Sequence, residues 1–555
     1  HPNENKGVFH DSTTTRLAGA AATATLLLTA CAGGGGGAGG GGATKLDVDL
    51  SNLATTTAPG TAVVEELNWN LPYEPMSLDP QHSFNYAENT VIANLCDSLL
   101  RMNPDLSTGP GLAASVEQPD DTTYVYTLQD GVTFWDGSPL TPADVVYSLS
   151  RQAGPDATSY YSEYFTYFQS AEVTGENQVT VRLSQPDALF GQGMSSAAGA
   201  IVQQKAAEAG GESFGTPTAG VQCTGPFELA EWNAGKSIVL TKNAAYWDET
   251  LIPKVEKLTF SAIADESTAV NALRSGDVDG QFFYLPPAGL SQLEGADEVT
   301  TTYGKSFVFW TLAAAATDGL FANPDVRAAL LASIDRTAVA DVVFQGAALP
   351  APTLAGPDYW DTQADIFEPA WKQFSTKSDP AAATKLLEGA GDLSQPIVIA
   401  IQGSSAVHEQ TANLLQAAGE AIGLTIETKV IPAEQYGNLY FDPTAREGID
   451  AFFTTWYGNM ADPLDVYNVF ATGGDSNFNG YEAVGAQIEA ARQTIDPAER
   501  AQLTVGIQDQ VTQDLPWMPL NYMPTILVQN DRVSGATASV AYLSYPWAAT
   551  IGGVE

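Results

Sequence analysis

The sequence predicts an α/β protein with more than one domain. Its 555 residues exceed what one hydrophobic core organises, and a hydrophobic content of 44% is enough to fill several cores. Strand-like and helix-like patterns also alternate along the chain. The clearest example is an apolar run at 396–402, a helical pattern at 409–423 that ends in glycine, and an alternating run at 424–430. This order is typical of a βαβ unit and indicates a mainly parallel sheet.

The N-terminal segment is expected to serve export and anchoring. An apolar stretch that ends at Ala30 has the length of a signal-peptide core and is short for a bilayer span. It runs into Cys31 as LLLTAC, which resembles a bacterial lipobox; an ordinary signal peptide that contains a cysteine is the alternative. Residues 1–31 are therefore predicted to be a signal peptide with a lipobox. The glycine-rich and threonine-rich segment at 32–63 indicates a flexible tether.

The composition limits the classes of partner. The formal net charge of −42 comes from 65 acidic against 23 basic residues, so the surface repels nucleic acid and anionic lipid headgroups. Membrane contact is then expected through the lipid anchor only. If Cys31 carries lipid, Cys96 and Cys223 remain as a pair in an oxidising compartment. A disulfide between them is an open expectation, because the sequence does not give their separation.

The stretch from Asp120 to Arg151 contains the most complete local signals. Residues 123–128 alternate polar and apolar side chains, which is the pattern of a half-buried strand. Asp130-Gly131 indicates a turn, and the apolar residues at 132–135 predict the second strand of a hairpin.

A helix is predicted to follow this hairpin. Thr141 is its N-cap, Pro142 stands where a missing amide costs no hydrogen bond, and Asp144 can reach back to the cap. Apolar residues at helical spacing then supply a face for burial.

Further elements are predicted in order along the chain. The predicted strands are 178–183, 237–241 and 450–456, and the predicted helices are an amphipathic one at 89–102, one that begins at Pro324, and one at 496–513.

The order of these segments resembles the family 5 extracellular solute-binding proteins, which are the peptide- and nickel-type receptors of ABC importers. The similar segments are EPMSLDPQ at 74–81, GVTFWDGSPLTPADVVYSLSR at 131–151, CTGPF followed by YW within 223–247, and VRAALLASIDRTAVADVVFQG at 326–346. The resemblance implies a two-lobed periplasmic-binding-protein-like fold of type II, with an extra subdomain in the first lobe. Residues 64–307 would form lobe 1 with this subdomain, 308–514 would form lobe 2, and 515–555 would return to lobe 1.

The function that the resemblance implies is binding without catalysis. The protein would be a monomeric lipoprotein outside the cytoplasm, at the outer face of the cell membrane. It would capture a peptide or a similar polar solute between its lobes and deliver it to the permease of an ABC importer. No cofactor is expected.

The resemblance also places candidate ligand-binding residues. Trp456 matches a tryptophan in the pocket wall of the family, although a core tryptophan that ends a strand is the alternative. Tyr160 and Tyr161 fall where the family has an aromatic side chain over the ligand. Phe84 and Asn85 are further candidates.

Asn459 departs from the family pattern. Members that bind peptides usually have an aspartate three residues after the tryptophan, and it pairs with the α-ammonium group of the peptide. An amide does not neutralise a buried cation. Peptides with a free amino terminus are therefore disfavoured, although they keep first place, and an oligosaccharide stacked on Trp456 is the alternative ligand.

Catalytic and metal-binding motifs are incomplete. His408-Glu409 begins like a zinc-binding helix, but Ala412 stands where the second histidine is required. The 4 histidines of the chain are too few for a multi-histidine site, because His1 and His10 lie in the segment expected to be removed. Two other classes stay open: a secreted glycoside or peptide hydrolase with a carboxylate pair, and a surface receptor that keeps the fold without an importer.

Overall fold

The structure is a computed structural model that describes most of the chain. The described residues are 45–46, 48–83, 85–154, 158–315, 317–474 and 476–554. Cys31 and the predicted signal peptide lie outside them, as do Phe84 and part of the predicted tether. The chain divides into two units, His1–Gly42 and Ala43–Glu555, and all described residues belong to the second.

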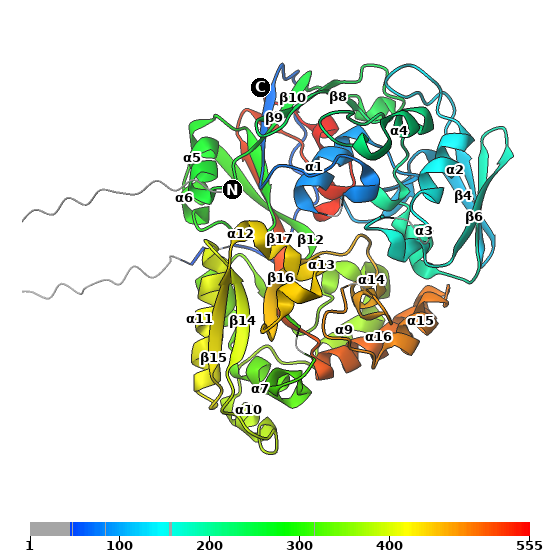
Figure 1. The fold of residues 1–555 in the computed structure, drawn as a ribbon. Coiled ribbons are helices and arrows are strands. Elements are labelled where there is room, and N and C mark those ends of the chain that lie inside the picture. Colours follow the sequence, from blue (N-terminus) through cyan, green and yellow to red (C-terminus); the bar gives the residue numbers. More distant parts are fainter. Residues whose placement is uncertain are drawn as a thin grey trace, which may run out of the picture. The chain divides into compact units, whose positions relative to one another are not determined.

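One large mixed sheet runs through the second unit (Figure 1). Its strands are β1 (Leu67–Leu71), β8 (Phe227–Asn233), β9 (Ser237–Lys242), β10 (Lys257–Ala262), β11 (Gly280–Phe283), β12 (Val299–Ala314), β13 (Leu349–Pro350), β14 (Ile397–Gln402), β15 (Ile426–Ile431), β16 (Ala451–Trp456) and β17 (Trp517–Asn530). They are ordered β15-β14-β16-β12-β17-β11-β1-β10-β9-β8, and β13 pairs with β17.

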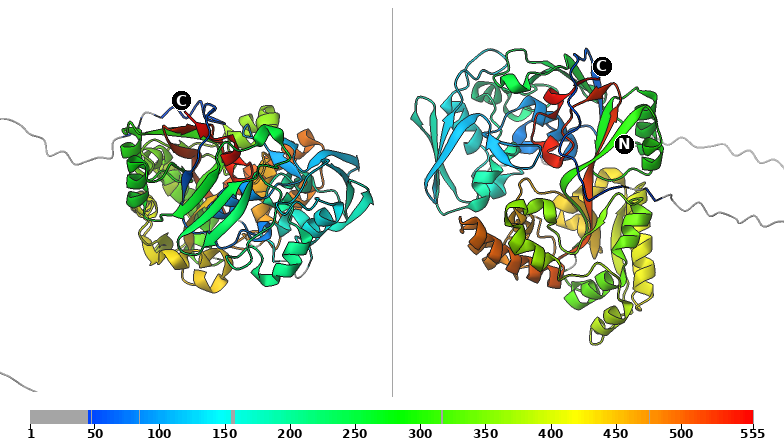
Figure 2. Two further views of the ribbon diagram at one scale, coloured as in Figure 1. Left: turned by 90° about the horizontal axis from the view of Figure 1, so that it is seen from above. Right: turned by 180° about the vertical axis from the view of Figure 1, so that it is seen from behind.

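Strands β12 and β17 join the two halves of this sheet (Figures 1 and 2). They pair antiparallel, and their register shifts between Gly304 and Val308. Residues of β12 before the shift lie beside the part of β17 that pairs with β11, and residues after it pair with β16. We refer to the elements from β1 to α6 (Leu290–Glu294) as lobe 1 and to the elements from α7 (Pro324–Ser333) to α16 (Pro497–Asp514) as lobe 2.

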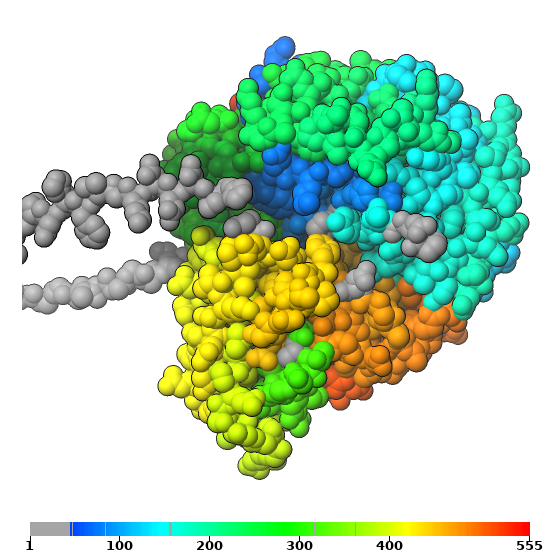
Figure 3. All heavy atoms as spheres, in the orientation of Figure 1, coloured from blue at the N-terminus to red at the C-terminus, as the bar shows by residue number. Residues whose placement is uncertain are grey.

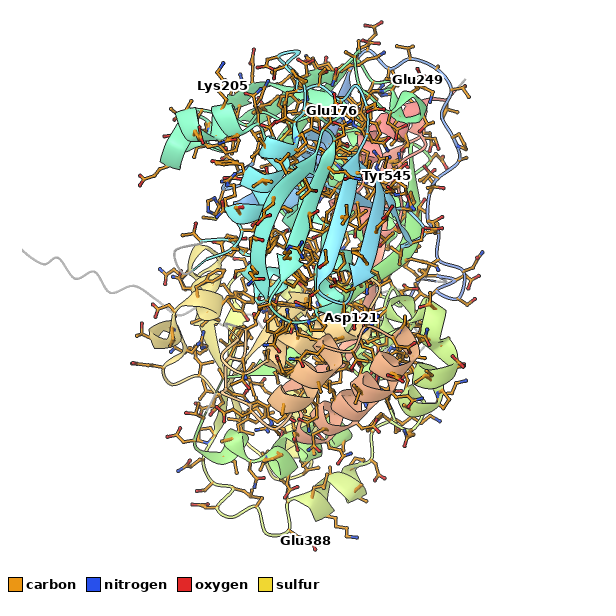
Figure 4. All side chains as sticks on the ribbon, turned by 90° about the vertical axis from the view of Figure 1, so that its right-hand side faces the viewer. Asp121, Glu176, Lys205, Glu249, Glu388 and Tyr545 are labelled. Carbon is orange, nitrogen blue, oxygen red and sulfur yellow. A yellow bond between two sulfur atoms is a disulfide. The ribbon has the colours of Figure 1, made fainter. Side chains whose placement is uncertain are left out.

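A second, four-stranded sheet belongs to lobe 1. It consists of β4 (Ala113–Asp120), β5 (Thr123–Leu128), β7 (Gln178–Leu183) and β6 (Phe168–Gly175), in that spatial order. Figure 4 shows it face-on, with the turns at Asp121 and Glu176 at its opposite ends.

The predictions for 120–151 are confirmed except for the hairpin. Helix α2 (Pro142–Ser150) begins with the predicted capping box, in which the Thr141 N–H donates to Asp144 Oδ2 at 3.0 Å. The hairpin is wrong, because β5 pairs with β4 and β7, and the segment 132–135 forms only an isolated bridge from Thr133 to Pro139. Strand β4 has no apolar alternation, since all of it after Ala113 is exposed.

The amphipathic helix predicted at 89–102 is also wrong in its bounds and character. Helix α1 (Tyr86–Leu95) is buried along its whole length, and 100–102 form strand β2 (Leu100–Met102). The C-terminal segment covers α1: the Trp547 indole N–H donates to Thr90 O at 2.9 Å, and Asn94 Oδ1 accepts from Ala548 N at 3.0 Å. A helix that is enclosed on all sides needs no polar face. The spacing of its apolar residues therefore does not show where the helix begins and ends.

The βαβ unit is confirmed in lobe 2, where β14 and β15 are parallel and α11 (Ala406–Glu420) connects them. The expectation of a mainly parallel sheet is wrong for the sheet as a whole. Strand β12 is antiparallel to both of its neighbours, and β9 is antiparallel to both β8 and β10. The prediction of parallel strands rested on the βαβ unit alone. It did not extend to the long strands β12 and β17, which pair antiparallel.

The remaining helices complete the lobes. They include α3 (Ala188–Gly193), α4 (Gln204–Gly210), α5 (Glu266–Ser275) and α6 (Leu290–Glu294) in lobe 1, and α9 (Ala364–Trp371), α10 (Pro380–Leu386), α14 (Pro463–Tyr467) and α15 (Gly485–Arg492) in lobe 2. A disulfide joins Cys96, the C-cap of α1, to Cys223 in the segment before β8. Among the described residues, no helix combines the length and the apolar character that a membrane span requires.

Candidate ligand-binding cleft

A cavity of about 2150 Å³ lies between lobe 1 and lobe 2. Lobe 1 lines it with residues 158–163, and lobe 2 lines it with the 402–408 and 453–457 segments. Trp310, on the connecting strand β12, also contributes to its wall. Figure 3 shows the outer face of this unit, where the surfaces of the two lobes meet.

Five of the residues predicted from the sequence line this cavity. They are Asn85, Tyr160, Tyr161, Trp456 and Asn459. The sixth, Phe84, lies outside the described residues. The structure therefore brings together residues that are more than 370 positions apart in the chain, from Asn85 to Asn459. Contact of any of them with a ligand stays a prediction.

The two tyrosines hold different positions. Tyr160 is 43% exposed, and its ring centroid lies 6.0 Å from that of Phe441 in lobe 2. Tyr161 is buried; its hydroxyl donates to Ser83 O and accepts from Asn89 Nδ2 at 3.3 Å. Burial raises the pKa of Tyr161 to about 12. Tyr160 is therefore a partly exposed side chain on the cavity wall, whereas the Tyr161 hydroxyl is already used within lobe 1.

Asn85 and Trp456 stand at the ends of two elements: Asn85 at the start of α1 and Trp456 at the end of β16. Asn85 is the N-cap of α1, and its Oδ1 accepts from Tyr86 N at 2.9 Å. Trp456 is the half-buried last residue of β16, with its ring 5.2 Å from that of Trp517 in an edge-on contact. Trp456 thus lines the cavity and also packs against the core, so the two interpretations offered for it from the sequence are compatible.

The loop after Trp456 is held at fixed points. The Tyr359 hydroxyl accepts from Gly458 N at 2.9 Å and donates to Phe307 O at 2.6 Å. A Cβ at Gly458 would lie 2.6 Å from the Tyr359 ring and 2.8 Å from Asp465 Oδ2, so only glycine fits there. This close packing fixes the backbone at Gly458 and therefore the position from which the Asn459 side chain extends.

Asn459 belongs to a hydrogen-bonded set of three side chains. Its backbone N–H donates to Asp465 Oδ2 at 2.7 Å, and its side-chain Nδ2 donates to the Tyr164 hydroxyl at 3.0 Å. That hydroxyl in turn donates to Asp465 Oδ1 at 2.6 Å. Burial raises the pKa of the Asp465 carboxyl to about 7, and the negative charge of Glu163 adds to this shift.

Tyr164 and Asp465 were not among the residues predicted from the sequence. Tyr164 belongs to a short 3-10 helix, Ser162–Phe165, in the aromatic stretch that supplied Tyr160 and Tyr161. Asp465 lies two residues after Pro463. The presence of a second acidic residue so close to Asp462 was the one feature of the sequence that could have marked it as a candidate. A contact across 301 residues of sequence is not visible in any local pattern.

Other polar contacts also join the two lobes. Arg492 of α15 pairs with Asp187, the N-cap of α3, and both side chains are buried. Arg492 Nη2 also donates to Glu163 O at 2.9 Å. Nearby, Gln192 Nε2 donates to Asp462 Oδ2 at 3.3 Å. The structure is therefore a closed arrangement of the two lobes.

The charges around the cavity are mainly negative. The acidic and basic residues that line it, histidine aside, are Glu163, Asp265, Glu266, Glu489, Arg446 and Arg492. Arg492 is neutralised by Asp187. The potential inside the cleft thus favours ligands that are rich in hydrogen-bond donors over ligands that are strongly anionic.

His408 lines the same cavity without the features of a metal ligand. It is buried, its Nδ1 accepts from Gln402 N at 3.2 Å, and burial lowers its pKa to about 3. It is therefore neutral at physiological pH, with the proton on Nε2. Within the described ranges, no group of three or more histidine, cysteine or acidic side chains is arranged to hold a metal ion.

Comparison with known proteins identifies the family. The model of the bacterial extracellular solute-binding proteins, family 5 Middle, matches residues 107–478, which is more than half of the chain. The chain belongs to family 5. The resemblance of its motifs to this family is thereby confirmed.

The similar proteins cover most of the chain. The glutathione-binding protein GsiB of Salmonella typhi is 27% identical over 475 residues, which span 83% of this chain and 89% of GsiB. AgaA of A.tumefacien R10, solved in complex with agropinic acid, has a TM-score of 0.76 at 22% identity and covers 88% of this chain and 99% of its own. DppA of Helicobacter pylori, solved in complex with the peptide STSA, has a TM-score of 0.76 at 21% identity, with 89% and 99% covered. At these identities the solved structures establish the fold, and the predicted two-lobed periplasmic-binding-protein fold is confirmed.

Proposed function

We propose that this family 5 protein captures a peptide or a similar polar solute outside the cytoplasm and delivers it to the permease of an ABC importer. The observation that carries the proposal is the cavity of about 2150 Å³ enclosed between two lobes. Its wall combines aromatic rings with a few directed polar groups, which is the usual character of a solute site. GsiB, which is named as a glutathione-binding protein, and DppA, which was solved with a peptide, support a peptide-like ligand.

The proposed mechanism is closure of the two lobes over the ligand. The connecting strands β12 and β17 lose their regular register between Gly304 and Val308, and a local change of backbone direction there would move lobe 2 as a body. Ligand that touches both walls binds the closed form better and shifts the population toward it. The permease would then recognise the closed form. The irregular register supports a lobe boundary near 307/308, and the end of α16 at Asp514 supports one near 514/515.

The ligand need not be a peptide. AgaA was solved with agropinic acid, so a structure of this fold accommodates another kind of polar solute. Trp456 is half-buried on the cavity wall, and an aromatic ring at such a place is suited to stacking on a sugar. An oligosaccharide therefore stays the alternative ligand.

We propose binding rather than catalysis, with no cofactor. The named relatives are binding proteins, which supports this choice over a secreted hydrolase. A surface receptor without an importer would share the closed fold but would have no permease partner.

The proposed location is the outer face of the cell membrane, with Cys31 lipidated and the 32–63 segment as the tether. The sequence LLLTAC supports this proposal. The fold is proposed to act as a monomer, since one chain contributes both walls of the cavity.

Native mass spectrometry of protein purified without denaturation tests the function. A co-purified small molecule at one copy per chain, lost after Trp456→Ala, is the expected result. Calorimetry with pools of short peptides and of oligosaccharides then assigns the class. Failure of every pool to bind, together with no retained molecule, would contradict the proposal.

A further inference from the structure

We propose that Tyr164 and Asp465 hold the side chain of Asn459 with its carbonyl oxygen toward the cleft. The ligand would then present a neutral N–H or O–H group to Asn459 in place of an ammonium group. This inference rests on the proposed function and deepens it, because it assigns the chemistry of one ligand group. Tyr164 and Asp465 act as positioning residues, since neither needs to touch the ligand.

The first step is the single proton of the Tyr164 hydroxyl. Burial holds the pKa of Tyr164 well above its ordinary value, so the hydroxyl keeps this proton. With Asp465 ionised, its two oxygens can only accept, and Oδ1 takes the Tyr164 proton at 2.6 Å. The Tyr164 oxygen is left as an acceptor. It can therefore receive only a donor from Asn459, which is the Nδ2 group at 3.0 Å.

The second step is the direction of the remaining amide atom. Because Nδ2 points to Tyr164, Oδ1 points away from it. The backbone of Asn459 is fixed as well, since its N–H donates to Asp465 Oδ2 at 2.7 Å. In the part of the chain that the structure describes, no hydrogen bond is donated to Asn459 Oδ1, and Asn459 lines the cavity. This oxygen is thus an unused acceptor on the cleft wall.

The third step is the reason why an amide stands at position 459. A carboxylate there would place a second anionic oxygen against the Tyr164 oxygen, whose proton is already donated. Asp465 is buried beside it, and Glu163 is close enough to raise the pKa of Asp465. Like charges packed this closely at low dielectric repel strongly. One carboxylate is therefore kept behind the wall, and a neutral acceptor faces the ligand.

The arrangement forms only when the lobes are closed. Tyr164 belongs to lobe 1, whereas Asn459 and Asp465 belong to lobe 2. In an open form the amide loses the partner that orients it. Recognition of a neutral donor and closure of the lobes are therefore coupled.

The test exchanges the two side chains. Four variants are compared at pH 8, where Asp465 is ionised: Asn459→Asp, Asp465→Asn, the double exchange, and Asn323→Asp as a control. Asn323 caps α7 and does not line the cavity, and aspartate serves equally well as an N-cap, so this control adds the same charge outside the Tyr164 and Asp465 set. Thermal unfolding is measured without ligand. The expected result is a lower midpoint for Asn459→Asp, recovery of the wild-type midpoint in the double exchange, and little change in the control.

Binding is then measured with two pools of short peptides of the same sequences, one with free amino termini and one N-acetylated. The wild type should bind the acetylated pool more tightly, and the double exchange should reverse this preference by about tenfold or more. A wild-type preference for the free amines would overturn the inference, as would an Asn459→Asp midpoint equal to that of the wild type. If neither pool binds, the peptide ligand of the proposed function fails, and the unfolding series still decides the orientation of Asn459.

Discussion

Arg492 of lobe 2 and Asp187 of lobe 1 form an ion pair that is closed off from solvent. The Arg492 Nε lies 3.2 Å from Asp187 Oδ1, and the two side chains are 5% and 1% exposed. Arg492 also contacts Asn468 and the Glu163 carbonyl, so its hydrogen bonds are largely satisfied. This ion pair is broken when the lobes separate. It stabilises the closed form while both residues are present, whereas one of them alone would be an unpaired buried charge.

Replacing Arg492 by methionine should open the protein. Asp187 would be left as an uncompensated buried charge in the closed form, which costs about 3 kcal/mol or more, whereas water solvates it in the open form. Ligand affinity should fall by roughly a hundredfold. Small-angle scattering and calorimetry measure the two effects. Lys372→Met breaks the exposed pair with Glu368 and is the matched control; equal losses in both variants would contradict the role of the buried pair.

The stability of the protein should depend on pH through Asp465. Burial raises its pKa to about 7 in the folded protein, from 3.8 in the unfolded chain. Below the unfolded value the carboxyl is protonated in both states, and its contribution to stability is fully present. As the pH rises through about 7 the folded state must ionise a buried group, so this contribution is lost.

Asp465→Asn removes this dependence. The unfolding midpoint of the variant, relative to the wild type, should therefore rise between pH 4 and about pH 7 and level off towards pH 8. Melting curves across this range measure the difference between the two proteins, in which the titration of all other groups largely cancels. A difference that is constant with pH, or that falls, would show that Asp465 does not carry the shift.

Local chemistry was predictable where a few adjacent residues decide the structure. The capping box at Thr141 and Asp144 follows from its own four residues, and it is present as expected. The βαβ unit around α11 was predicted for the same reason. Strand β4 could not be predicted, because an exposed strand is fixed by its backbone partner β5 and has no apolar pattern.

The cleft shows the same division. The family resemblance placed Tyr160 and Asn459, and both line the cavity. It did not indicate that Asn459 is bonded to Tyr164, or that Arg492 meets Asp187, because these contacts join segments about 300 residues apart and depend on how the lobes close. Sequence patterns predict the local structure of each segment. Contacts between lobes are set by the packing of the whole chain.

The disulfide should contribute substantially to stability. Cys96 and Cys223 are both buried and are separated by 127 residues, so their bond restricts a long loop in the unfolded chain. Replacing both by alanine should lower the free energy of unfolding by about 2–5 kcal/mol. Denaturant unfolding measures the loss. A reducing agent should destabilise the wild type by a similar amount and leave the double variant unchanged; a wild type insensitive to full reduction would exclude this contribution.

Gly304, at the irregular register of β12, should tolerate no side chain. A Cβ there would lie 1.9 Å from the carbonyl oxygen of Ala538, a contact with backbone that no rotamer change relieves. Gly304→Ala should therefore force the connecting strand away from the C-terminal segment and lower the unfolding midpoint. Gly506, inside α16, is the matched control, because a Cβ there meets nothing within 4 Å. Gly506→Ala should stabilise the protein by about 0.5–1 kcal/mol through the better helix propensity of alanine. Thermal unfolding of both variants measures the contrast, and a Gly304→Ala protein as stable as the wild type would mean that the connecting strands can shift at this point without cost.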